Sequence, residues 1–176
     1  MRLTEIGLQG AFLVDLEPSV DERGFFARAF CLQEFEAAGL NTHWVQHNIA
    51  FNRQRGTLRG IHYQCAPHAE IKLVRCTAGA LCDIIVDLRL DSPTYCQWIG
   101  VELSADNRRA LYIPEGFGQG FQTLADNTEV YYHMGAFYHP ECARGVRWND
   151  QTFAIDWPLT ERIVSERDEL FPDWIK

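Results

Sequence analysis

Short apolar segments, each interrupted after a few residues by glycine, proline or an Asp/Asn pair, run through most of this 176-residue chain. This pattern favours many short β-strands that pack as a sandwich or a barrel. The expected strands lie near 11–16, 25–30, 44–51, 57–64, 71–77, 80–88, 97–103, 109–113, 119–124 and 128–138. A short helix is expected at 32–39, and a helical turn near 165–170. No repeat or linker divides the chain, so we expect residues 1–176 to form a single all-β domain.

Charge and cysteine spacing exclude several classes of protein. The net charge of −8 argues against the basic surface that nucleic-acid binding requires, so no nucleic-acid partner is expected. No apolar run approaches the roughly 20 residues that cross a membrane, and residues 1–10 lack the hydrophobic segment of an export signal. The six cysteines lack CxxC spacing, which disfavours a zinc site. We therefore expect a cytoplasmic protein with reduced thiols and no membrane partner.

The segment 57–64, with the sequence TLRGIHYQ, carries the strongest candidate for proton transfer. Histidine is the residue type in this segment that ordinarily titrates near neutral pH, which suits His62 to act as a base. In a regular strand Arg59 and His62 would point to opposite faces, whereas a bulge or bend at Gly60 could bring both inward. The alternative for His62 is a structural histidine held by hydrogen bonds.

Two further residues offer an acid and a fixed positive charge. Lys72 lies in an otherwise apolar segment, where a partly buried ammonium group is costly unless it meets an anion or a developing oxyanion. Tyr132 lies in the segment 128–138 and either donates a proton or packs as a core aromatic residue. We expect the remaining histidines to be structural or solvated: His43, His47, His68, His133 and His139.

A catalytic metal is not expected. Barrel proteins that hold a metal often supply an HxH pair, a glutamate and a later histidine that ends a PxGxxH segment. Here Tyr63 and Gln64 follow His62, and the segment that begins at Pro114 ends in Gln119, whose amide is a poor metal ligand. Both the histidine pair and the last ligand are missing.

Six segments together resemble the dTDP-4-dehydrorhamnose 3,5-epimerase family. Their order and spacing also match, from about residue 10 to residue 170. They are 21–26 (DERGFF), 56–64 (GTLRGIHYQ), 72–76 (KLVRC), 86–94 (VDLRLDSPT), 113–117 (IPEGF) and 145–150 (GVRWND). The resemblance implies a metal-free, cupin-type jelly-roll barrel with a few short helices, usually a homodimer. It also implies a nucleotide-linked 4-keto-6-deoxyhexose as substrate and no cofactor.

The resemblance also implies roles for individual residues. His62 would be the base, oriented and charged by Asp168. Tyr132 would donate a proton on the opposite face of the sugar ring, and Lys72 would face the developing enolate oxygen. The residues expected to bind substrate are Arg23, Arg28, Gln46, Asn48, Arg59, Gln119 and Tyr138.

Three positions depart from the family pattern. Gln119 stands in the place of a family histidine, so hydrogen bonding persists there but titration does not. Arg28 and Ala143 replace residues that are often acidic, which predicts weaker discrimination for thymidine and leaves guanine or cytosine nucleotides as alternatives. Inversion at C3, C5 or both is expected. Two alternatives are a 3,4-ketoisomerase on the same scaffold and a sugar-nucleotide-binding protein that has lost its activity.

Overall fold

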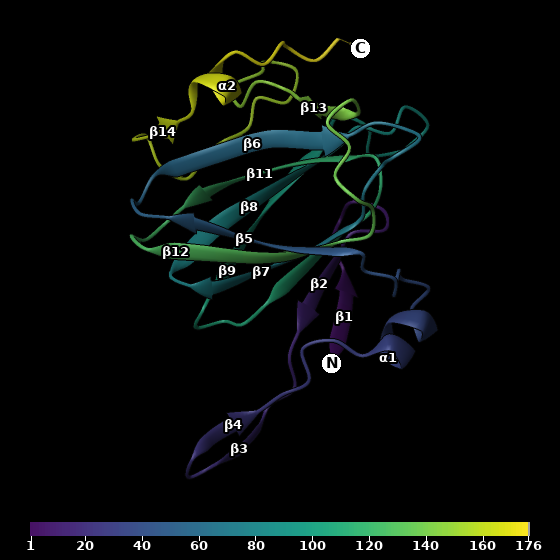
Figure 1. Ribbon diagram of the computed structural model, residues 1–176, viewed down its shortest axis with the longest axis vertical. Coiled ribbons are helices and arrows are strands. Elements are labelled where there is room, and N and C mark those ends of the chain that lie inside the picture. The colour runs from purple at the N-terminus through teal and green to yellow at the C-terminus, as the bar shows by residue number, and fades with distance from the viewer. Residues whose placement is uncertain (176) are drawn as a thin grey trace.

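Two antiparallel β-sheets face each other in the computed structural model, which describes residues 1–175 (Figure 1). The first sheet has the strand order β1 (Arg2–Glu5), β2 (Phe12–Asp15), β10 (Ala110–Ile113), β7 (Lys72–Ala78), β12 (Thr128–Met134) and β5 (Gln46–Asn52). The second has the order β13 (Ala143–Gly145), β6 (Thr57–Gln64), β11 (Phe117–Thr123), β8 (Ala80–Asp87) and β9 (Trp98–Ser104), and β14 (Ile163–Val164) pairs in parallel with β6.

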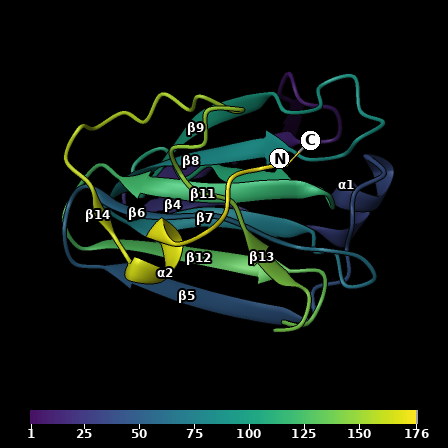
Figure 2. The ribbon, with the colours of Figure 1, turned by 90° about the horizontal axis from the view of Figure 1, so that it is seen from above.

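Over β5 to β8 and again over β9 to β13, consecutive strands alternate between the two sheets, which is the connectivity of a jelly roll. The chain thus crosses repeatedly from one sheet to the other, and Figure 2 shows the strands from above, with α2 lying over them. Apolar side chains from both sheets fill the space between them, among them Val74, Leu81, Ile85, Leu111 and Val130. The all-β jelly roll expected from the sequence is therefore confirmed.

The elements outside the two sheets are short. The helix α1 (Leu32–Ala37) anchors on the first sheet through Phe35, which is fully buried and lies 6.3 Å from Tyr112 between ring centroids. The second helix, α2 (Glu166–Glu169), lies over β6 and begins at Ser165, whose hydroxyl accepts a hydrogen bond from the Asp168 amide (Figure 1). No helix within residues 1–175 has the length and apolar character needed to span a membrane.

A hairpin formed by β3 (Ser19–Asp21) and β4 (Gly24–Phe26) extends away from the two sheets (Figure 1). It replaces the longer strand expected at 25–30. Three large apolar side chains on it are exposed to solvent, namely Val20, Phe25 and Phe26. An exposed apolar cluster of this kind is typical of an interaction surface.

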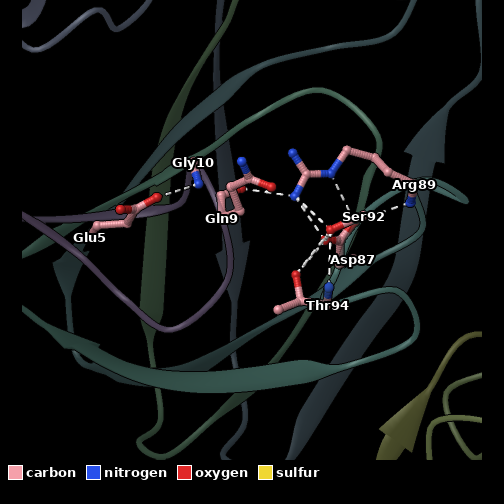
Figure 3. Close-up of polar contacts among 7 residues, drawn as sticks. All are labelled: Glu5, Gln9, Gly10, Asp87, Arg89, Ser92 and Thr94. Atoms are coloured by element: carbon pink, nitrogen blue, oxygen red, sulfur yellow. Dashed lines mark hydrogen bonds and ion pairs between the residues drawn. The ribbon is translucent and has the colours of Figure 1, made fainter.

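The motif at 86–94 stabilises the fold. Arg89 donates two hydrogen bonds to the carboxylate of Asp87, at 2.7 and 2.8 Å, and a third to the backbone oxygen of Gln9 (Figure 3). Burial alone would raise the pKa of Asp87, but hydrogen bonds from Arg89, Ser92 and Thr94 lower it to about 2. This network ties the end of β8 to the N-terminal loop and lies outside the residues that line the main cavity.

Candidate active site

A cavity opens between the two sheets and contains most of the residues that the sequence singled out. It has an outer part of about 340 Å³ and an inner part of about 230 Å³, and both are lined by His62, Lys72 and Tyr132. His62 comes from β6 in one sheet, whereas Lys72 and Tyr132 come from β7 and β12 in the other. The expected substrate-binding residues that also line it are Gln46, Asn48, Arg59, Gln119 and Tyr138.

An irregularity in β6 brings both Arg59 and His62 to this cavity. Gln119 pairs with His62 and Phe121 pairs with Arg59, so β6 uses three steps where β11 uses two. The extra residue lies next to Gly60, whose φ of +119° is open to glycine but strained for other residues. A side chain at position 60 would also collide with the backbone of Gly120. The bulge at Gly60 considered in the sequence analysis is therefore present.

His62 and Asp168 form a close pair on the β6 side of the cavity. The Nε2 atom of His62 lies 2.7 Å from Oδ1 of Asp168, and the backbone N–H of Gly60 donates to the other carboxylate oxygen at 3.4 Å. Burial of Asp168 acts to raise its pKa, but the hydrogen bond and charge of His62 bring the net shift below the ordinary value. An ionised carboxylate on Nε2 fixes the imidazole ring and leaves Nδ1 for proton transfer.

Lys72 has a partner that the sequence analysis missed. Its Nζ atom lies 2.8 Å from Oε1 of Glu70, and both side chains are more than 90% buried. Both residues also line the outer cavity, so the lysine charge stands at the wall of the site and is held by a carboxylate. The sequence feature that could have revealed this ion pair is a glutamate two positions before a lysine in an apolar segment.

One wall of the cavity consists of amide and aromatic side chains. Tyr132 pairs with Asn48 across the β12–β5 ladder, which places the two side by side. Gln46 donates to the Asn48 side-chain oxygen at 3.1 Å and accepts a hydrogen bond from the Tyr138 amide at 3.2 Å. These contacts hold Tyr138 at the mouth, where Ala143 also lies.

Gln119 contacts a buried carboxyl group behind the inner cavity. Its Nε2 atom donates to Oδ1 of Asp83 at 2.9 Å, while Oδ2 of Asp83 has no hydrogen-bond partner within residues 1–175. Complete burial raises the pKa of Asp83 to about 7, although Gln119 and the charge of Lys72 oppose the shift. Asp83 therefore titrates close to neutral pH.

This buried carboxyl group should make the stability of the protein depend on pH. Between about pH 4 and 7 the unfolded chain has released the proton that folded Asp83 retains, so stability falls as pH rises, by up to about 1.4 kcal/mol per pH unit. An Asp83→Asn variant lacks this contribution. We expect the wild-type free energy of unfolding, minus that of the variant, to decrease from pH 4 to 7 in urea titrations. A constant difference over that range would contradict the assignment.

Two expected substrate-binding residues lie outside the cavity of their own chain. Arg23 is in the projecting hairpin, where it binds the carboxylate of Asp21. Arg28 precedes α1 and donates to Glu34 at 3.0 Å. Neither residue lines the cavity, so any role in substrate binding needs a second chain or a rearrangement.

Comparisons with known proteins agree with this geometry. The model of the family described as dTDP-4-dehydrorhamnose 3,5-epimerase matches residues 5–175. The chain is 45% identical over 155 residues to the dTDP-4-dehydrorhamnose 3,5-epimerase of Shigella flexneri, which covers 86% of this chain and 85% of that protein.

Solved structures show the same similarity. A crystal structure of dTDP-4-dehydrorhamnose 3,5-epimerase from Bacillus anthracis, with TDP and PPi bound, superposes with a TM-score of 0.95 at 40% identity, covering 98% of this chain and 99% of that one. A dTDP-6-deoxy-D-glucose-3,5-epimerase from Legionella pneumophila, in complex with dTDP-4-keto-L-rhamnose, gives 0.91 at 36% identity, covering 98% and 92%. Sequence and structure thus match along nearly the whole length, and this chain belongs to the dTDP-4-dehydrorhamnose 3,5-epimerase family.

Proposed function

We propose that this protein inverts C3 and C5 of a dTDP-linked 4-keto-6-deoxyhexose by removing a proton from one face of the sugar and returning one to the other. The observation that carries the proposal is the placement of His62, paired with Asp168, and Tyr132 on opposite sheets around one cavity. A base and an acid on opposite sides of a ring are what inversion at carbon requires.

The ketone at C4 makes the hydrogens at C3 and C5 acidic. His62 accepts one of these protons, and the electron pair moves into an enolate whose oxygen carries the negative charge. The Lys72 ammonium group stabilises that oxygen, and its ion pair with Glu70 holds the group in position. Tyr132 then donates a proton from the other face, and both protein groups exchange their protons with solvent. Because side chains of the protein accept and supply every proton that moves, we propose that the reaction needs no cofactor.

The direct test is to incubate the enzyme with dTDP-4-keto-6-deoxyglucose in heavy water and follow C3 and C5 by NMR. We expect deuterium at both carbons together with the inverted product. Movement of the carbonyl to C3 would instead identify a ketoisomerase. Tight binding of the substrate without exchange at either carbon would identify a binding protein without activity.

Asp168 should tune the base without touching the substrate. We expect Asp168→Asn to slow epimerisation by about 10- to 100-fold, less than loss of His62 itself, because the imidazole remains but its neighbouring negative charge is gone. The pH dependence of kcat should also change, which a purely structural role would not cause. An unchanged rate and pH profile would remove Asp168 from the site.

Two of the positions that depart from the family pattern offer little to select thymine, because Arg28 is bound by Glu34 and Ala143 has no polar group. We expect calorimetry with dTDP, UDP, GDP and CDP to show binding of dTDP with less than tenfold preference, or ~1.4 kcal/mol, over the next base. A larger preference would contradict the prediction of weak discrimination and leave the epimerase proposal intact.

We also propose a cytoplasmic homodimer. The exposed apolar residues of the hairpin, together with Ile49 and Phe51 on the outer side of β5, offer the apolar surface that a second copy would bury. In such a dimer the hairpin could carry Arg23 to the partner's cavity. All six cysteines are free thiols, which suits a reducing compartment. Light scattering should give twice the mass of the chain, and a monomer at micromolar concentration would exclude the dimer.

A further inference from the structure

Two histidines expected to be structural or solvated meet beside Gln64, which lines the outer cavity. His68 lies in the loop after β6, and His139 lies in the segment between β12 and β13. Their rings stack with centroids 3.4 Å apart and planes 9° apart. Nδ1 of His139 is 2.9 Å from Oε1 of Glu141, and one ligand atom from each of the three residues lies within 4.8 Å of the others.

The buried side chain of Gln64 holds the two histidine segments together. Its Nε2 atom donates to the backbone oxygens of His68, at 2.9 Å, and Phe137, at 3.1 Å. Its Oε1 atom accepts from the His139 amide at 2.7 Å. One side chain, only 4% exposed, thus fixes the backbone of both histidines, so the cluster is part of the folded scaffold.

We propose that His68, His139 and Glu141 form a binding site for a zinc-type divalent transition metal ion. Two imidazole nitrogens and one carboxylate oxygen are a common set of ligands for zinc, which leaves a fourth position for water. Around an ion with bonds of about 2.0–2.1 Å, tetrahedral ligand atoms are about 3.3 Å apart. The three ligand atoms lie within 4.8 Å of one another. No pair therefore has to close by more than about 1.5 Å to reach this separation.

The position of this site gives it a consequence for the cavity. The metal would link the loop that follows β6 to the segment 137–142, and Gln64 and Tyr138, which adjoin these segments, line the outer cavity. The ion would therefore brace the mouth through which a ligand enters. It takes no part in proton transfer, and the inference does not depend on the proposed reaction.

Two other groups of side chains could offer ligands to the same kind of ion. On the outer face of the first sheet, Nδ1 of His133 lies 3.2 Å from Nε2 of His47. Next to the proposed site, Cys65 and Cys142 pair through their backbones at 3.0 Å, and both are free thiols. Variants of these residues serve as matched controls, because they remove a potential ligand and leave the proposed three in place.

The experiment is calorimetric titration of the metal-free, full-length protein with zinc chloride. We expect one ion to bind per chain. Binding should be at least tenfold weaker in the variants His68→Ala, His139→Ala and Glu141→Gln. It should stay within twofold of wild type in the two controls, His133→Ala and the double variant Cys65→Ser/Cys142→Ser. Cobalt as a spectroscopic probe should show a bound spectrum without thiolate charge-transfer bands.

Thermal unfolding without metal checks that each variant folds, and His139→Asn provides a smaller change should His139→Ala fail. Loss of binding in either control, a thiolate band with cobalt, or no stoichiometric binding below about 100 μM zinc would overturn the proposal. Because none of these measurements uses substrate, the result stands apart from whether the protein epimerises a sugar.

Discussion

Replacing His62 with alanine is expected to abolish deuterium exchange at C3 and C5 and to lower kcat/KM for epimerisation by about 1,000-fold or more, which corresponds to about 4 kcal/mol. The methyl group cannot accept a proton, and no other imidazole lines the cavity among residues 1–175. Binding of dTDP should change little, because the nucleotide is expected to be held by other groups. NMR in heavy water and calorimetry measure the two effects separately.

The matched control is His43→Ala, which removes an exposed histidine from a loop outside the cavity. We expect it to retain the wild-type rate. Exchange that persists at one carbon in the His62→Ala variant would mean that a second base serves that carbon, which would contradict the use of one base for both centres. Equal losses in both variants would point to an effect on folding.

The sequence predicts the fold well because the decisive signals are local. Apolar segments of strand length and the glycines between them specify the strands, and all ten expected strands overlap a strand in the structure, although the one expected at 25–30 is cut to Gly24–Phe26. The strands that the pattern does not predict are only two to four residues long, namely β1, β3, β13 and β14. Such short segments carry little alternation, and β1, β13 and β14 are defined by their pairing with β2 or β6.

The site is predicted less completely, for a physical reason. Alternation along β6 would place Arg59 and His62 on opposite faces, and only the pairing with β11 reveals the extra residue that brings them together. The contact of Gln119 with Asp83 likewise joins residues 36 positions apart. Composition and spacing indicate which residue types are present. They do not predict which side chain each buried charge contacts, because the packing of the two sheets decides that.

A second large effect is expected at Tyr132, and it separates the acid from the base. The Tyr132→Phe variant keeps the aromatic ring that packs against the core and loses only the hydroxyl group. Proton removal by His62 should continue, so deuterium should still enter C3 or C5 within about tenfold of the wild-type rate. Formation of the inverted product should fall by about 100-fold, in the range typical for loss of a general acid.

The distinguishing result is therefore exchange without inversion. With no donor on the far face, the enolate recovers a deuteron from His62 on the face it left, and the sugar keeps its configuration. Tyr131→Phe is the control, because that hydroxyl lies on the outer face, 2.8 Å from Nδ1 of His47, and should not affect the rate. If Tyr132→Phe inverted both centres at the wild-type rate, another group or a water molecule would have to supply the proton. The opposite placement of His62 and Tyr132 would then be a feature of packing and not of the reaction.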